Sequence, residues 1–229
     1  MKFPLLVGLA LGFLRIASAD PVCINGTLAS YEALGSGGCS IGGNTVASFA
    51  VVSGITGAVA IDPSSVNVMP PGGTLNPAVV FETDQLAGAG TVLEAIFTYT
   101  IAGGVYGADT ITLSGSSETG DGAVTDTQNF CAGGNFGPDG VTGCSGSTSG
   151  ALLTLDGVQN EDQTTLPGSN LLSITDDFVL DGGTVGSASG GTFADRFNVT
   201  PEPASVVLLG GTGLLLIALR KLSSQIRNS

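Results

Sequence analysis

Apolar and polar residues alternate with a period of two along several short stretches of this 229-residue chain. In an extended strand, successive side chains point to opposite faces, so such alternation predicts strands with one buried face. The clearest run predicts a strand over Thr91–Ile101, whose one wholly apolar face comprises Leu93, Ala95, Phe97, Tyr99 and Ile101. Thr192–Val199 alternates in the same way and places Phe193, Asp195, Phe197 and Val199 on one face.

Similar runs recur between turn-forming residues, and they predict a chain of short strands. The predicted strands are Thr45–Val52, Ile55–Ile61, Ala78–Glu82, Thr91–Ile101, Thr110–Ser114, Ala151–Leu155, Leu171–Ile174, Asp177–Leu180 and Thr192–Val199. The chain holds 37 glycines and no long helical pattern precedes its last thirty residues. We therefore predict an all-β domain over residues 20–199, an antiparallel β-sandwich of roughly eight to ten strands. The stretch Ser114–Gly150, rich in Gly, Ser and Thr, is interpreted as a long excursion from it.

The first 19 residues have the pattern of a secretory signal peptide. Lys2 precedes an apolar stretch over Phe3–Leu14, and the small residues Ala17 and Ala19 mark a cleavage site. This stretch is shorter than the ~20 residues of a spanning helix. We expect a signal helix that directs export through Sec and is then removed by signal peptidase, so that the exported chain begins at Asp20. The alternative is a buried N-terminal helix.

The opposite end combines three segments in a fixed order. Pro201, Glu202 and Pro203 come first, an apolar run follows over residues 204–219, and residues 220–229 form a basic tip. Sixteen apolar residues make a helix of ~24 Å, slightly short of a ~30 Å hydrocarbon core. Basic residues at the tip favour the cytoplasmic side, so we expect one C-terminal transmembrane helix with the bulk of the chain outside the membrane.

This arrangement over residues 200–229 resembles the PEP-CTERM sorting tail. The resemblance covers the tail alone and implies that Pro201, Glu202 and Pro203 are a sorting motif read by an exosortase, a membrane cysteine transpeptidase. It also implies a Gram-negative host, transient anchoring in the inner membrane, and association with exopolysaccharide production at the cell surface or outside the cell. The alternative is an ordinary C-terminal anchor that is never processed.

Four cysteines remain after the predicted signal, namely Cys23, Cys39, Cys131 and Cys144. An even number in an exported chain predicts disulfides, for which three connectivities exist. Local pairing, Cys23 with Cys39 and Cys131 with Cys144, is the simplest. Zinc is disfavoured because the chain lacks histidine and a Cys-x-x-Cys pair.

Charge and composition exclude several classes of function. All 19 acidic residues lie between Asp20 and Glu202, where Arg196 is the one basic residue. Such a surface repels nucleic acid and anionic lipid, so we expect no nucleic-acid partner. Without histidine or lysine in this part, a serine or cysteine nucleophile lacks its usual base, and we expect no enzyme and no cofactor.

Calcium is the one ion that the sequence favours, because Ca²⁺ binds oxygen ligands on loops. Carboxylates cluster near glycine turns, and the candidate ligands are Asp156, Glu161, Asp162, Asp176, Asp177 and Asp181, with Asp121 and Asp126 as a further pair. Acidic loops that only keep the protein soluble are the competing interpretation.

The sequence thus predicts an exported, non-catalytic protein of the cell surface or extracellular matrix, sorted by an exosortase and associated with exopolysaccharide. An adhesin-like binding module for a glycan, calcium or ice is the alternative.

Overall fold

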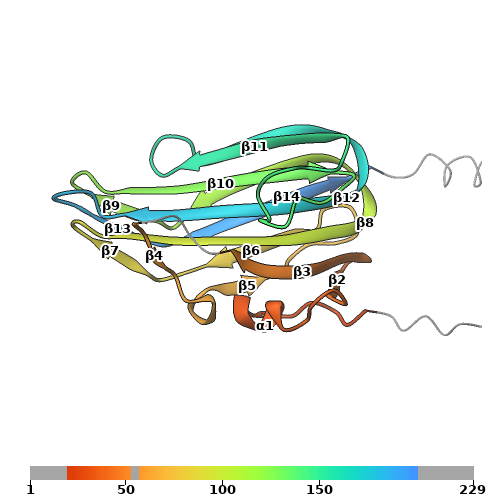
Figure 1. Ribbon diagram of the computed structural model, residues 1–229, viewed down its shortest axis with the longest axis horizontal. Helices are drawn as coiled ribbons and strands as arrows, with labels where there is room; N and C mark the ends of the chain where they lie inside the picture. Colours follow the sequence, from red (N-terminus) through yellow and green to blue (C-terminus); the bar gives the residue numbers. More distant parts are fainter. Residues whose placement is uncertain (1–19, 53–56, 201–229) are drawn as a thin grey trace, which may run out of the picture.

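The computed structural model describes residues 20–52 and 57–200. The predicted signal peptide with its cleavage site at Ala17 and Ala19, and the tail with Pro201, Glu202 and Pro203, lie outside the described residues. Fourteen strands and two short helical turns make up this part of the chain (Figure 1). None of the described helices is long and apolar enough to cross a membrane.

The elements follow one another in short steps. They are β1 (Gly26–Thr27), α1 (Leu28–Glu32), β2 (Cys39–Ile41), β3 (Asn44–Val52), β4 (Val59–Ala60), the 3₁₀ turn η1 (Pro63–Ser65), β5 (Asn67–Met69), β6 (Ala78–Glu82), β7 (Leu86–Gly88), β8 (Val92–Ser114), β9 (Ser117–Thr119), β10 (Ala123–Ala132), β11 (Thr148–Leu155), β12 (Glu161–Asp181), β13 (Ser187–Ser189) and β14 (Thr192–Val199).

The strands form an eleven-stranded sheet and a separate three-stranded sheet. All pairings among the described strands are antiparallel except that of β4 with β8. The mostly antiparallel architecture agrees with the predicted β-sandwich. Many strands have only two or three residues, which explains why the sequence predicted fewer of them.

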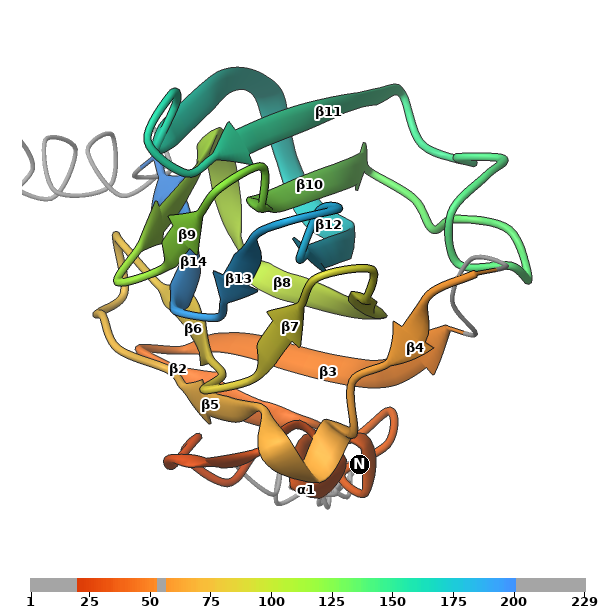
Figure 2. The same ribbon diagram turned by 90° about the vertical axis from the view of Figure 1, so that its left-hand side faces the viewer.

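Strands β8 and β12 run through both layers of the large sheet (Figures 1 and 2). The first half of β8 pairs with β3 and with the second half of β12, and β10 and β11 extend that layer. The second half of β8 pairs with β14, which leads through β6 and β5 to β1 in the opposite layer. The two layers thus share their central strands.

Glycines make the bend in β8 possible. Gly103 has φ +109°, and a Cβ there would lie 3.0 Å from the carbonyl oxygen of Gly43. A Cβ on Gly104 would lie 2.8 Å from both methyl groups of Val199. The alternation predicted two strands in place of β8, Thr91–Ile101 and Thr110–Ser114, and two in place of the second half of β12, Leu171–Ile174 and Asp177–Leu180. Both divisions are wrong: β8 bends at Gly103 and Gly104 and continues in the sheet, and β12 pairs in unbroken register with β8 and β10 through Thr175 and Asp176.

Aromatic rings from the two layers meet in the core. Phe193 of β14 stacks on Phe81 and Phe178, with ring centroids 4.9 and 4.6 Å away, and Phe81 lies 4.5 Å from Phe97. All four side chains are at most 1% exposed. Burial of aromatic surface on this scale is the main source of stability in such a sandwich.

Both predicted disulfides are present. Cys23 pairs with Cys39 and ties the N-terminal segment to β2, and Cys131 pairs with Cys144 and closes the loop after β10. This confirms the local connectivity. Disulfides persist in oxidising compartments, which agrees with an exported chain.

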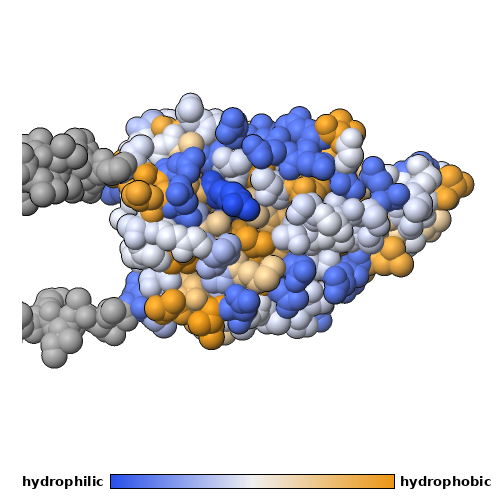
Figure 3. All heavy atoms as spheres, turned by 180° about the vertical axis from the view of Figure 1, so that it is seen from behind, coloured by the Kyte–Doolittle hydropathy of each residue, from blue (hydrophilic) through white to orange (hydrophobic). Residues whose placement is uncertain are grey.

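The described chain starts and finishes at the same end of the sandwich, beside the bend in β8. The carboxylate of Asp20 accepts a hydrogen bond from Thr45, which pairs with Ala102 of β8, and the amide of Thr200 donates to the carbonyl of Val105. The three-stranded sheet of β7, β13 and β9 forms the opposite end, which we call the tip (Figure 1). Apolar side chains are exposed there, among them Leu86 and Val185, and Figure 3 shows hydrophobic surface at that end.

Candidate functional site

The loop between β10 and β11, residues 133–147, folds back over the outer face of the large sheet. Thr175 of β12 donates a hydrogen bond from its hydroxyl to the carbonyl of Gly140. The loop approaches so closely that a Cβ on Gly140 would lie 2.7 Å from a methyl carbon of Thr98. The Cys131–Cys144 disulfide holds the base of the loop. The loop is therefore attached to the sheet both at Gly140 and at its base.

Short-range hydrogen bonds fix the conformation inside this loop. The carboxylate of Asp139 accepts from the Thr142 hydroxyl and from the amides of Thr142 and Val141, the last two at 2.9 and 3.1 Å, and these bonds lower its pKa. The amide of Gly137 donates to the carbonyl of Thr142 at 2.6 Å. A loop with this many internal bonds is organised before any ligand arrives, which lowers the entropic cost of binding.

A groove of about 190 Å³ lies between the loop and the sheet. We call it the loop groove; the side chains that define it are those of Ser48, Thr98, Thr100, Asn135, Phe136 and Ser173. A second hollow of about 530 Å³, lined by residues that include Val51, Ile96 and Asp139, adjoins it through Thr98 and Gly140. Together they form an extended depression on one face of the sandwich.

Ser48 has an unusual backbone at the edge of this groove. Its φ is +58°, and it is the only non-glycine residue with positive φ among the described residues. It lies in a bulge between Ala47 and Ala50, and its amide donates to the carbonyl of Gly35 at 2.9 Å. Residues held in this region cost of order 1 kcal/mol and are frequent at binding sites. The bulge exposes the Ser48 side chain at the groove.

The groove offers hydroxyl groups, one side-chain amide and one partly exposed aromatic ring. No carboxylate or basic side chain lines it; Tyr99 borders it but is 0% exposed, and Asp139 lines the adjoining hollow. Hydroxyl and amide groups donate and accept hydrogen bonds, and an aromatic face packs against apolar C–H surface. This arrangement suits a neutral ligand rich in hydroxyl groups, and it supplies no paired nucleophile and base.

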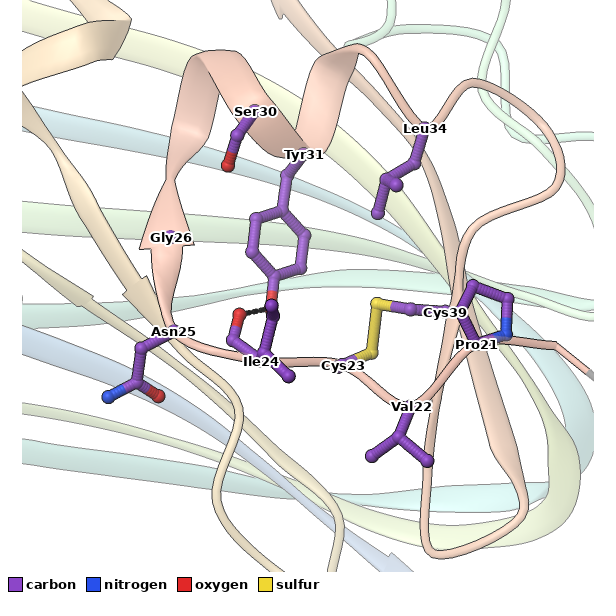
Figure 4. A pocket seen from close by; sticks show the side chains of 10 residues that line it. All are labelled: Pro21, Val22, Cys23, Ile24, Asn25, Gly26, Ser30, Tyr31, Leu34 and Cys39. Carbon is purple, nitrogen blue, oxygen red and sulfur yellow. Dashed lines mark hydrogen bonds between the residues drawn. A yellow bond between two sulfur atoms is a disulfide. The ribbon is translucent and has the colours of Figure 1, made fainter.

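An apolar hollow of about 270 Å³ lies beside the N-terminal disulfide (Figure 4). The ring of Tyr31 extends from α1 into it, and its hydroxyl donates to the carbonyl of Ile24 at 2.8 Å. Burial raises the pKa of Tyr31 to about 12. Because this hydroxyl already has its partner, the hollow presents apolar surface with few polar groups that could orient a ligand.

The carboxylates proposed for calcium do not converge on one site. Asp162 accepts from the amides of Leu153 and Gln163, and Asp181 accepts from that of Gly183. Asp156, Glu161 and Asp181 are partly or fully exposed, and Asp177 points to the opposite side of β12 from Asp176. Half-burial and the nearby Glu94 raise the pKa of Asp177 to about 6. Of the six candidate ligands, Asp176 alone joins a compact group.

That compact group lies in the core, between the two layers. Asp126 of β10, Asp176 of β12 and Asp195 of β14 each place a carboxylate oxygen within 4.8 Å of the others, and each residue is 0% exposed. Tyr99 of β8 donates its hydroxyl to Asp195. Asp109, also 0% exposed, lies near Asp195 and Asp176. We call the four aspartates the carboxylate cluster.

Much of this cluster has no hydrogen-bond partner. No well-aligned hydrogen bond reaches either carboxylate oxygen of Asp109, Asp126 or Asp176, or either amide atom of Gln128, although the carboxyls of Asp176 and Asp195 lie close enough to share a proton. Gln128 is 0% exposed and lies directly across from Asp176 on the neighbouring strand. Its amide is close enough to Asp195 to lower the pKa of that aspartate, although the geometry is not that of a well-aligned hydrogen bond. Buried polar groups without partners cost about 1–3 kcal/mol each, so the arrangement requires an explanation.

Burial dominates the electrostatics of the cluster. It raises the pKa of Asp109, Asp126, Asp176 and Asp195 above the ordinary value, and the neighbouring carboxylates raise the pKa of the first three further. Burial also raises the pKa of Tyr99 well above its ordinary value. The described residues contain no basic side chain in this region, since Arg196 is exposed. The cluster therefore needs protons or a cation to balance its charge.

The sequence pattern indicated the neighbourhood of the cluster but not the site. It placed Asp195 on the inner face of Thr192–Val199, and it placed Asp126 and Asp176 in separate loop groups. The interpretation of Ser114–Gly150 as an excursion is wrong for residues 123–132, because these form the internal strand β10. The alternation of Val124, Asp126, Gln128, Phe130 and Ala132 was the available signal, and its two polar members concealed it.

No family model matches the chain, and no curated protein matches it. Two solved structures are similar in part. TmCBM61 in complex with β-1,4-galactotriose is 12% identical, over 64% of this chain and 86% of its own, with a TM-score of 0.26. The enzymatically active domain of bacteriophage CBA120 tailspike protein 4 is 15% identical, over 68% of this chain and 19% of its own, with a TM-score of 0.25. At these TM-scores neither likeness carries an argument about function.

Proposed function

We propose that the chain is an exported, non-catalytic protein of the cell surface or extracellular matrix that an exosortase sorts and that associates with exopolysaccharide. The disulfide-bonded β-domain between the predicted signal peptide and the predicted sorting tail carries this proposal. Both disulfides join residues that follow the predicted cleavage site, and oxidised cysteines are typical of exported domains.

The position of the last strand supports the sorting part of the proposal. Strand β14 finishes at Val199, and Thr200 still bonds to Val105, so the folded domain extends to the residue before Pro201. By sequence alone, prolines at 201 and 203 disfavour helical backbone, so we expect an exosortase to meet the motif as an extended peptide. Glu202 is the charge between them that an exosortase can recognise.

Replacing Pro201, Glu202 and Pro203 with alanine tests the sorting step in a host that has an exosortase. We expect the variant to remain full-length in the membrane fraction, whereas the unaltered chain loses the segment after the motif. The intact mass of the released protein measures this. Normal release of the variant would show that residues 200–229 are not a sorting signal.

The loop groove is the surface that supports binding of exopolysaccharide. Its hydroxyl and amide groups match the hydrogen-bonding groups of neutral sugars, and Phe136 supplies an aromatic ring. The acidic surface of the domain would repel an anionic polymer, so we propose that the groove takes a neutral glycan segment.

Binding of the host's purified exopolysaccharide to the exported protein tests this assignment. Phe136→Ala should weaken binding about tenfold, equivalent to about 1.4 kcal/mol. Val185→Ala, a truncation of an exposed apolar residue at the tip, is the matched control and should bind normally. Equal loss in both variants, or no binding by the unaltered protein, would contradict the groove assignment while leaving the sorting proposal intact.

A further inference from the structure

We infer that Asp126, Asp176 and Asp195 bind a divalent cation, calcium, between the two layers of the sandwich. The inference rests on the described core and is independent of the sorting tail and the loop groove. Three strands that are distant in the sequence each contribute one carboxylate, and the oxygens lie within 4.8 Å of one another. Two oxygens on opposite sides of one Ca²⁺ are about 4.6–5.2 Å apart, since each Ca–O distance is about 2.3–2.6 Å.

A second feature also points to a ligand. The amide of Gln128 is 0% exposed, has no hydrogen-bond partner at Oε1 or Nε2, and lies beside Asp195. The group that lowers the pKa of Asp195 is the Nε2 donor, so Gln128 would present Oε1 as a fourth ligand after a flip of its amide. A cation at the centre would give partners to oxygens of Asp126 and Asp176 that have none within the protein. One ion thus accounts for several of the unpartnered atoms.

The donor set selects the kind of metal. All candidate ligands are oxygen atoms, and the full chain contains no histidine, while its four cysteines form the two disulfides. Oxygen-only sites favour hard cations such as Ca²⁺, Mg²⁺ and Mn²⁺ over zinc or copper. Mg²⁺ retains several waters in most protein sites, whereas the three aspartates and Gln128 are all 0% exposed. A site enclosed to this degree favours calcium.

The charge and the burial of the site determine when during folding the ion can bind. Three carboxylates and one Ca²⁺ leave a net charge of −1, which becomes −2 if the buried Asp109 beside Asp195 is also ionised. The Tyr99 hydroxyl already donates to Asp195. Without a cation, the same carboxyls remain buried only if they are largely protonated, because the described core holds no basic side chain. The ion therefore binds as the layers close, and its binding free energy contributes to folding.

The main experiment uses the exported full chain, purified in detergent with its disulfides intact. Metal content is measured by mass spectrometry, and thermal unfolding is followed in millimolar CaCl₂, in MgCl₂ and in chelator. We expect about one calcium per chain and a melting temperature roughly 5–10 °C higher in calcium at a hundredfold excess over Kd. Magnesium should give a smaller shift.

Two variants locate the site. Asp176→Asn keeps the shape of the side chain and should abolish the calcium-dependent shift, while Asp181→Asn, on the same strand but exposed, should preserve it. Terbium provides a readout that does not depend on stability, because it replaces calcium and is excited through nearby tyrosine. The chain has no tryptophan, and of its three tyrosines Tyr99 is the one that donates to the cluster, so emission should be lost in Tyr99→Phe.

The competing explanation is a cluster of carboxyls that share protons. It predicts no bound metal, equal melting temperatures in calcium and chelator, and an Asp176→Asn variant at least as stable as the unaltered protein. Those results would overturn the inference. Calcium binding that survives Asp176→Asn but is lost on altering exposed aspartates would also overturn it, because the ion would then lie elsewhere.

Discussion

The core and the tip of this domain place aspartates in opposite physical situations. In the core, burial raises the pKa of Asp126, which has no hydrogen-bond partner. At the tip, just before the same strand, Asp121 is exposed and accepts from the amides of Thr184 and Val185, both at 2.9 Å, and from the Thr184 hydroxyl at 2.6 Å. These bonds hold the pKa of Asp121 well below its usual range.

The difference shows that local donors and burial, rather than residue type, decide what a carboxylate does in this fold. Asp121 organises a turn, because it is charged at neutral pH and surrounded by N–H and O–H groups. Asp126 lacks such donors and is surrounded by other carboxylates. The two regions also differ in what holds their strands, since aromatic packing stabilises the core and side-chain hydroxyl pairs link the strands of the tip.

The largest expected effect is in the aromatic part of the core. Phe193→Ala removes a ring that contacts Phe81, Phe97 and Phe178 across the two layers, and it leaves a cavity. We expect the free energy of unfolding to fall by about 3–5 kcal/mol, measured by denaturant titration. Val185→Ala at the tip is the control and should change it by less than about 0.5 kcal/mol. Similar losses in both would remove the contrast between core and tip.

A smaller, local effect is expected from Asp121→Asn. The neutral amide forms weaker hydrogen bonds with Thr184 and Val185, so amides of the tip should exchange faster while the core keeps its protection. The folded-state pKa of Asp121 lies below the unfolded value of ~3.9. Its stabilising contribution is therefore complete above that pH and is lost as the pH falls below it.

Hydrogen-exchange protection factors at several acidic pH values measure this effect. In the unaltered protein the tip should lose protection as the pH falls from about 5 to about 2, and in Asp121→Asn this pH dependence should be reduced. Identical pH profiles in the two proteins would show that Asp121 does not organise the tip.

The smallest effect is expected from Ser189→Ala. The hydroxyl of Ser189 lies 2.8 Å from that of Ser117 on the neighbouring strand, and this pair is exposed to water. We expect a loss of about 0.5 kcal/mol or less, detectable as faster amide exchange in β9 and β13. A loss comparable with that of Phe193→Ala would mean that the tip and the core unfold as one unit.

The sequence predicted best those strands that are short and bounded by turn residues. Strands β6 and β14 have the predicted bounds, and Cys131 and Cys144 pair as predicted. Strand β8 was divided where Gly103 and Gly104 resemble a turn, since local sequence does not reveal that both halves pair with β12. The bend depends on close contacts with Gly43 and Val199, which are distant in the chain.

The candidate sites were harder to predict for a related reason. Asp126 and Gln128 occupy inward-facing positions of β10, where a periodicity argument expects apolar residues, so the strand was not recognised. The carboxylate cluster combines residues of three strands, and only the pairing of the sheet brings them together. The loop groove depends on the Thr175–Gly140 hydrogen bond, which has no signature in local sequence.

The sharing of β8 and β12 by both layers has a consequence for how the domain resists degradation. Each strand has more than twenty residues and hydrogen-bonds within both halves of the sandwich, so one half cannot detach while the other stays intact. The two layers are therefore expected to unfold cooperatively. Proteases that require an unfolded segment can then cut only during rare global unfolding. For a protein exported as proposed, to a place where no chaperone refolds a partly opened domain, two continuous strands would thus act as protection against cleavage.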